Sequence, residues 1–173
     1  ASEAAPLLFG TALHDALNRY FRKRFDNKEG KDETVGKEYL QDVYGWYLER
    51  HRHRFTQKEL DNFMIYGKRI LGQFYDRYAA TWTEGIRYDL EYRVQDVHVD
   101  GVPIKGFIDR IDRMGNSIMV YDYKSGASDS ISRKLKGPDA SDDVGGHYWR
   151  QMVFYDLLLR EDPRIKQGMT AGH

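Results

Sequence analysis

The chain has 173 residues, 40% of them hydrophobic and 14% aromatic, so it is long enough for one substantial core and too apolar to be disordered. Its 27 basic and 27 acidic residues cancel, which excludes a uniformly basic protein that coats nucleic acid but allows a local basic groove. The absence of cysteine excludes disulfides, thiol catalysis and an iron–sulfur cluster in this chain. With no long apolar run, we expect a cytoplasmic protein without a membrane span.

The first predicted element is a helix over residues 6–24, where apolar side chains recur every three or four positions and Pro6 suits the first turn. His14 lies at the edge of that apolar stripe, a position from which a side chain can reach a cleft. On this spacing alone, His14 is either a metal ligand or a boundary histidine without a special role.

Two further helices are expected before any strand. Residues 36–52 carry apolar side chains on one side, and the basic run over 50–54 then suits an exposed helix end. Thr56 and Glu59 have the spacing of a capping box and predict a helix over 56–82, whose aromatic residues we expect in the core.

Alternating apolar residues then predict three consecutive antiparallel strands. The first runs from residue 88 to 99, and Asp100-Gly101 is a strong turn signal before a strand over 102–113. A second turn at 114–117 leads into the strand that carries Asp122 and Lys124.

Charged side chains gather at the end of this last hairpin. Side chains two apart on a strand share a face, so Asp122 and Lys124 should emerge together, beside Asp109 of the neighbouring strand. Buried charges need a partner or a metal, and hard oxygen ligands suit Mg²⁺ or Mn²⁺. Asp112 faces the other side of a regular strand, and we assign it to an ion pair with Arg110 or Arg113.

The last part of the sequence combines a long connection with a helix. Residues 125–146 are polar and rich in glycine, and we expect either a flexible basic flap beside the cleft or a plain loop. A helix follows over 147–161, with Gln151 and Tyr155 four residues apart on one face, and Asp162-Pro163 should end it.

Three runs of residues, with an early histidine, now stand in a recognisable order: His14, then Gly106-x-x-Asp109-Arg110-Ile111-Asp112, then Asp122-Tyr123-Lys124-Ser125-Gly126, then Gln151-x-x-x-Tyr155. Together they resemble the PD-(D/E)XK nuclease superfamily, and most closely its RecB-like branch, the nuclease domain of helicase–nuclease proteins. The resemblance spans residues 9–159. Each run is weak alone, and the signal lies in their order.

The resemblance implies an α/β (α+β) fold with a restriction-endonuclease-like core. This core is a small mixed sheet that starts with antiparallel hairpins and is flanked by helices on both sides, after an N-terminal helical section. We therefore expect residues 1–173 to form a single nuclease domain, helical over 6–84 and sheet-bearing over 86–162, and to be a fragment of a larger protein.

The resemblance also implies a Mg²⁺-dependent deoxyribonuclease, with Mn²⁺ able to substitute, of exonuclease type and acting in repair or recombination. Its partners would be DNA, as single strands or duplex ends, and a helicase domain or subunit. The catalytic residues would be Asp109, Asp122 and Lys124. The metal ligands would be His14, Asp109, Asp122 and the backbone carbonyl of Tyr123. The substrate contacts would be Gln151, Tyr155 and Arg110.

Two other functions stay open at this point. One is a catalytically silent module that binds nucleic acid on the same fold, and the other is a carboxylate-based hydrolase of a different substrate. The intact set of Asp109, Asp122 and Lys124 favours the nuclease over the silent module, and the order of the motifs argues against the third possibility. No Walker-type phosphate loop is present, so an ATP-driven motor would lie outside this chain.

Overall fold

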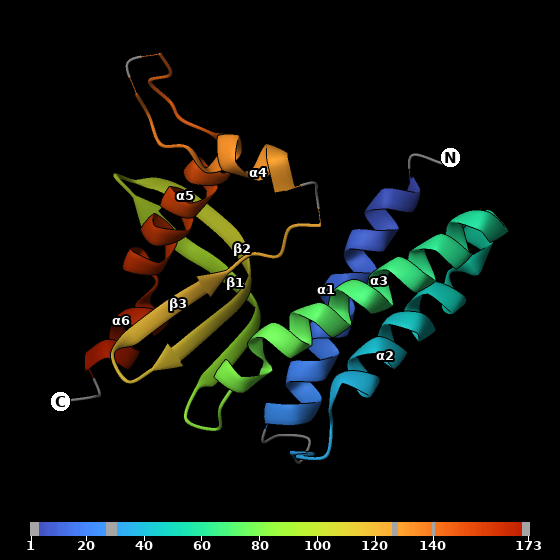
Figure 1. Cartoon of the computed structure of the whole chain (residues 1–173). Coiled ribbons are helices and arrows are strands. Elements are labelled where there is room, and N and C mark those ends of the chain that lie inside the picture. The colour runs from blue at the N-terminus through green and yellow to red at the C-terminus, as the bar shows by residue number, and fades with distance from the viewer. Residues whose placement is uncertain (1–3, 27–30, 126–127, 140, 171–173) are drawn as a thin grey trace. The chain divides into compact units, whose positions relative to one another are not determined.

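The computed structural model describes residues 4–26, 31–125, 128–139 and 141–170 (Figure 1). The chain divides into two compact units, Ala1–Leu90 and Glu91–His173, and each is described here by itself. No helix within the described ranges is both long enough and apolar enough to cross a membrane.

The first unit is built from three helices, α1 (Ala4–Phe25), α2 (Lys37–Arg50) and α3 (Gln57–Tyr78), which pack side by side in Figure 1. Two short 3₁₀ turns follow α2 and α3, at Arg52–Arg54 and Ala79–Thr81. The three predicted helices are confirmed, with ends that shift by a few residues. The capping box is also present, because the backbone N–H of Glu59 donates to Thr56 Oγ1 at 3.2 Å and the Glu59 carboxylate accepts from the Thr56 N–H.

A glycine allows α2 and α3 to approach closely. A Cβ atom at Gly67 would lie 2.1 Å from the ring of Tyr44, which is fully buried and donates its hydroxyl hydrogen to the carbonyl of Phe63 at 2.7 Å. Not every aromatic residue of α3 joins the core, because Tyr66 and Tyr78 are 45% and 38% exposed, and for these two residues the prediction is wrong. Tyr78 instead lies at the end of the helix, under the guanidinium of Arg77.

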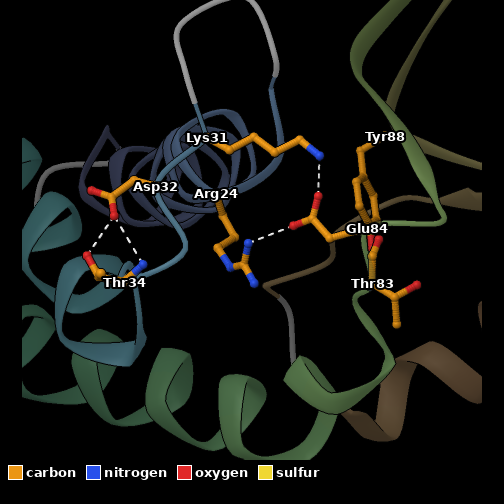
Figure 2. A network of polar contacts seen from close by, with 7 residues as sticks. All are labelled: Arg24, Lys31, Asp32, Thr34, Thr83, Glu84 and Tyr88. Carbon is orange, nitrogen blue, oxygen red and sulfur yellow. Dashed lines mark hydrogen bonds and ion pairs between the residues drawn. The ribbon is translucent and has the colours of Figure 1, made fainter.

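A polar network fastens the segment that follows α3 to the end of α1, as Figure 2 shows. The Glu84 carboxylate accepts from Arg24 Nη1 at 2.8 Å and also pairs with Lys31. Next to it, the Tyr88 hydroxyl accepts from the backbone N–H of Thr83 at 2.9 Å. These surface contacts join residues far apart in the sequence, so they hold the segment after α3 against the end of α1.

A three-stranded sheet follows, in the order β1-β2-β3: β1 (Arg87–Val99), β2 (Val102–Met114) and β3 (Ser117–Tyr121). The first hairpin turn has φ of 49° at Asp100 and 79° at Gly101, the left-handed backbone that two-residue turns require. Asp96, at φ of 58°, marks a bulge-like irregularity in β1, which explains why Val94 and Val97 are both buried although they are three residues apart.

Helix α5 (His147–Glu161) packs on this sheet and is followed directly by α6 (Pro163–Thr170). Their core consists of apolar side chains from both strands and helices: Val94, Val97, Ile108, Ile111, Tyr155, Leu158, Leu159 and Ile165. Gly106 is needed for this packing, because a Cβ atom there would lie 2.2 Å from Leu158 Cδ1. The antiparallel sheet flanked by helices confirms the predicted fold class and is consistent with a restriction-endonuclease-like core.

The predicted connection over 125–146 contains a helix, α4 (Ser128–Leu135), so the expectation of a stretch without secondary structure is wrong. The C-terminal end of α4 meets the beginning of α5, where the backbone N–H of Gly146 donates to the carbonyl of Lys136 at 2.8 Å. A Cβ atom at Gly146 would lie 2.3 Å from the carbonyl oxygen of Lys134. Only glycine fits at this junction, and it fixes α4 beside α5.

Candidate active site

The site begins where β3 ends. In the β2–β3 ladder Arg110 pairs with Tyr121, so extending the register by one position sets Asp109 opposite Asp122. The segment beyond Tyr121 lies outside the ladder, and a side chain replaces the missing strand contact. Asp109 Oδ2 accepts from the backbone N–H of Tyr123 at 2.7 Å. The register and this hydrogen bond therefore bring the two acidic residues to the same end of the hairpin.

Helix α5 orients the Asp122 carboxylate through two neutral donors. Asp122 Oδ1 accepts from Gln151 Nε2 at 3.1 Å and from the Tyr155 hydroxyl at 2.8 Å. Gln151 Nε2 also donates to the Tyr155 hydroxyl oxygen at 2.7 Å. Gln151 and Tyr155 were predicted to contact substrate, and the contacts in the structure give them a further task, which is to hold this carboxylate in one orientation.

The second oxygen of Asp122 has a different environment. Asp122 Oδ2 is buried and accepts no hydrogen bond from the described residues, and its near neighbour is Lys124 Nζ at 2.5 Å, an ion pair outside hydrogen-bond geometry. The Asp122 side chain is 11% exposed and that of Lys124 is 30% exposed. One oxygen is thus fixed by the protein, while the other faces only a partly exposed cation.

This arrangement fits part of a divalent metal site. Carboxylate oxygens are the ligands that Mg²⁺ prefers, and among the described residues Asp122 Oδ2 has an ion pair with Lys124 but accepts no hydrogen bond. Within the described residues, however, no group of three or more His, Cys, Asp or Glu side chains is arranged to hold an ion. His14 is a half-buried residue of α1, and its role as a ligand, like that of the Tyr123 carbonyl, stays a prediction.

Arg110 and Asp112 lie on the other side of the hairpin and form a buried ion pair, as predicted for Asp112. Arg110 Nε lies 2.8 Å from Asp112 Oδ1, and the two side chains are 2% and 8% exposed. Arg110 Nη1 donates to the Tyr123 hydroxyl at 2.9 Å, and the guanidinium lies 3.9 Å from the centroid of the Tyr121 ring. This burial does not favour the predicted contact between Arg110 and substrate. Arg110 instead holds Tyr123, and with it the segment between Asp122 and Lys124.

Burial raises the pKa of three side chains in this region. It raises the pKa of Tyr155, and the hydrogen bond to Asp122 raises it further, so the phenol remains a donor. Burial likewise raises the pKa of Tyr123, although the Arg110 charge partly offsets the effect. Burial also raises the pKa of Asp112 and outweighs the opposing charge of Arg110.

Sequence reasoning missed one residue of this neighbourhood, Tyr148. Lys124 Nζ lies 4.9 Å from the centroid of its ring. Tyr148 precedes Gln151 by three residues and Tyr155 by seven, which is the spacing of a helical stripe, so the sequence did carry the signal. The neighbouring His147, four residues before Gln151, is exposed.

A family model described as the PD-(D/E)XK nuclease superfamily matches residues 1–172. No curated protein and no solved structure matches the chain.

Proposed function

Because the chain belongs to the PD-(D/E)XK nuclease superfamily, we propose that it is a divalent-metal-dependent deoxyribonuclease that hydrolyses phosphodiester bonds. One observation carries this proposal: just beyond β3 the carboxylate of Asp122 lies beside the ammonium group of Lys124, and the carboxylate of Asp109 on β2 accepts from the backbone N–H of Tyr123 between them. A catalytically silent relative has no need to preserve this grouping together with the donors that orient it.

Asp109 and Asp122 would hold the ion, with Mg²⁺ the expected metal and Mn²⁺ a substitute. A divalent ion bound there supplies an activated water and polarises the scissile phosphate. Gln151 and Tyr155 keep the Asp122 carboxylate turned toward the ion. Because Lys124 Nζ lies beside Asp122 Oδ2, the ammonium would compete with an ion for this oxygen.

Lys124 would stabilise the reaction by its charge. In hydrolysis, a water oxygen forms a bond to phosphorus, the bond to the leaving sugar oxygen breaks, and that oxygen takes up a proton. Negative charge increases on the phosphate oxygens in the transition state, where a fixed ammonium group is most effective. Its partial exposure leaves Lys124 accessible to a bound DNA strand.

We also propose the finer assignments that follow from the RecB-like motif order. These are exonuclease-type action on single strands or duplex ends, coupling to a helicase domain or subunit, a role in DNA repair or recombination, and a cytoplasmic location. Their support is the order of the motifs from His14 to Tyr155.

A cleavage assay tests the proposal. The purified chain is incubated with labelled linear single-stranded DNA, linear duplex, closed circular DNA and RNA, in Mg²⁺, in Mn²⁺ and in a chelator. We expect degradation of linear DNA that requires the metal, and no degradation by a Lys124→Ala preparation purified in parallel. Binding of DNA without cleavage in either metal would instead identify the silent module, and cleavage of circular DNA would overturn the exonuclease assignment.

A further inference from the structure

Two lysines share one aromatic ring beside the candidate site. Lys124 Nζ lies 4.9 Å from the centroid of the Tyr148 ring, and Lys134 Nζ of α4 lies 5.1 Å from the same centroid. Tyr148 is half-buried at the beginning of α5, so its ring is a fixed platform rather than a freely rotating surface group. A cation over an aromatic face gains only a small free energy, so the ring guides these lysines without immobilising them.

The position of Lys134 is imposed by the backbone. The carbonyl oxygens of Lys134 and Arg133 would lie 2.3 Å and 2.6 Å from a Cβ atom at Gly146, so the end of α4 rests directly on this glycine. Tyr148 follows two residues later, in the first turn of α5. The close contact at Gly146 therefore holds the end of α4 beside the first turn of α5, and from there the Lys134 ammonium lies over the ring.

The charges around the ring are not balanced. Lys124 pairs with Asp122, and Lys136 pairs with Asp139, but among the described residues Lys134 has no carboxylate partner. Two ammonium groups on one ring repel each other, and the repulsion is relieved when an anion binds between or beside them. Anions with spaced negative oxygens, such as consecutive phosphates of a nucleic-acid strand, match this arrangement.

We propose that Lys134 binds a backbone phosphate of the DNA strand next to the scissile one, and that Tyr148 is a positioning residue that sets both lysines. This inference rests on the proposed nuclease function, because it places the phosphate beside Asp122 and Lys124. Lys134 then contributes to DNA affinity, whereas Tyr148 contributes to turnover through Lys124.

The first test measures DNA binding without cleavage. Fluorescence anisotropy of a labelled single-stranded oligonucleotide, in Ca²⁺ or in a chelator, gives Kd as a function of salt for the wild type, Lys134→Gln and Arg133→Gln. Arg133 lies next to Lys134 on α4 and is exposed, so it is the matched control for the loss of one charge. We expect Lys134→Gln to weaken binding about fivefold and to lower the salt slope by about 0.7, the value for one phosphate contact on a single strand.

In the same assay, Arg133→Gln should leave Kd within about twofold, because a side chain without a phosphate contact contributes little beyond net charge. Equal effects of the two substitutions, or no effect of Lys134→Gln, would overturn the assignment of Lys134. This readout does not require cleavage, so it remains informative if the chain proves to bind DNA without cutting it.

The second test separates the ring of Tyr148 from its hydroxyl group. Tyr148→Leu should lower kcat about tenfold at saturating DNA, since a misplaced Lys124 loses charge stabilisation, while Tyr148→Phe keeps a π face and should retain most of the activity. An equal loss in both variants would overturn the positioning role.

A thermal melt of each variant identifies misfolding. The variant Gly146→Ala displaces α4 but keeps both lysines, and it should therefore reproduce the loss of DNA binding seen for Lys134→Gln.

Discussion

The two sides of the β2–β3 hairpin each carry an aspartate beside a cation, but the two pairs differ in what surrounds them. Asp112 is buried with Arg110, whose guanidinium contacts both carboxylate oxygens and lies over the Tyr121 ring. Asp122 has one oxygen held by neutral donors and the other beside the partly exposed ammonium of Lys124.

The two aspartates of this hairpin therefore have different roles, one in stability and the other in the candidate site. The Arg110–Asp112 pair is closed to solvent and compensated within the protein, so it can fix the backbone but cannot easily accept a ligand. The Asp122 carboxylate has neutral donors on one oxygen and a partly exposed ammonium beside the other, so a metal ion would have to compete with one lysine rather than enter a closed pair. The same residue types thus perform different tasks because their burial and their hydrogen-bond donors differ.

The largest effect is expected on the buried side. Arg110→Met leaves Asp112 as a buried charge without its partner, and we expect a loss of about 3–5 kcal/mol in the free energy of unfolding, measured by urea denaturation. The double variant Arg110→Met with Asp112→Leu removes both charges and should recover much of that loss. If the single variant is as stable as the wild type, the pair does not have the structural role assigned to it.

The second prediction concerns the open side. Lys124→Ala should lower kcat on the order of a hundredfold or more, because the ammonium group stabilises developing charge, and metal affinity should be retained.

Asp122→Asn should instead weaken metal binding, measured by calorimetry in the absence of DNA, with little change in stability. The matched substitution Asp112→Asn should do the reverse, since it lowers stability and spares metal affinity. A loss of metal affinity in Asp112→Asn that equals that in Asp122→Asn would remove the distinction between the two sides.

Much of the fold could be predicted because its signals are local. The capping box at Thr56 and Glu59, the turn at Asp100-Gly101 and the alternation along β2 each act within a few residues. Helix α4 could not be predicted in this way, because its sequence is polar and its position depends on the close contact of its last turn with Gly146. Helix α6 (Pro163–Thr170) was not predicted either, because the sequence analysis found no helical signal after Asp162-Pro163.

The candidate site was predictable where an extended segment supplied the geometry, although β3 ends at Tyr121, so the prediction that Asp122 and Lys124 lie on this strand is wrong and they follow it instead. The shared face of Asp122 and Lys124 follows from the period of two along an extended chain. The same rule could have chosen Arg110 over Arg113 as the partner of Asp112, because only Arg110 is two residues away from it. The role of Gln151 and Tyr155 as donors to Asp122 depends on how α5 packs on the sheet, and the sequence does not contain that packing in any local pattern.

The third prediction compares two buried phenols, one on each side of the hairpin. Tyr155→Phe removes a donor to the Asp122 carboxylate and should lower kcat about tenfold, as expected for a hydrogen bond to a charged group. Tyr123→Phe removes the acceptor of Arg110 Nη1 and should lower stability by about 1 kcal/mol with a smaller effect on kcat. Steady-state kinetics and urea denaturation of both variants test the pair, and an exchange of the two outcomes would contradict the division between the sides.

A further aspartate, the buried Asp162, gives the smallest expected effect and extends the comparison to pH. Burial alone would raise the pKa of Asp162, as it does for Asp112, but hydrogen bonds from Arg164 and Tyr92 together hold the pKa below its usual value. Tyr92 donates to Asp162 Oδ2 at 2.9 Å, and the Arg164 backbone N–H donates to Oδ1 at 2.9 Å.

Since the pKa is lower in the folded state, the ionised Asp162 stabilises the protein fully above its unfolded pKa of about 3.9, and this contribution disappears as the pH falls below that value. We therefore expect the free energy of unfolding, measured by urea denaturation at each pH, to fall more steeply below pH 4 in the wild type than in Asp162→Asn. Asp156→Asn, which alters only an exposed pair with Arg160, should follow the wild-type curve and serves as the control. If the free energies of unfolding of the wild type and Asp162→Asn fall in parallel with pH, the hydrogen-bond donors do not lower the pKa of Asp162. The contrast between the pKa shifts of Asp112 and Asp162 would then need another cause.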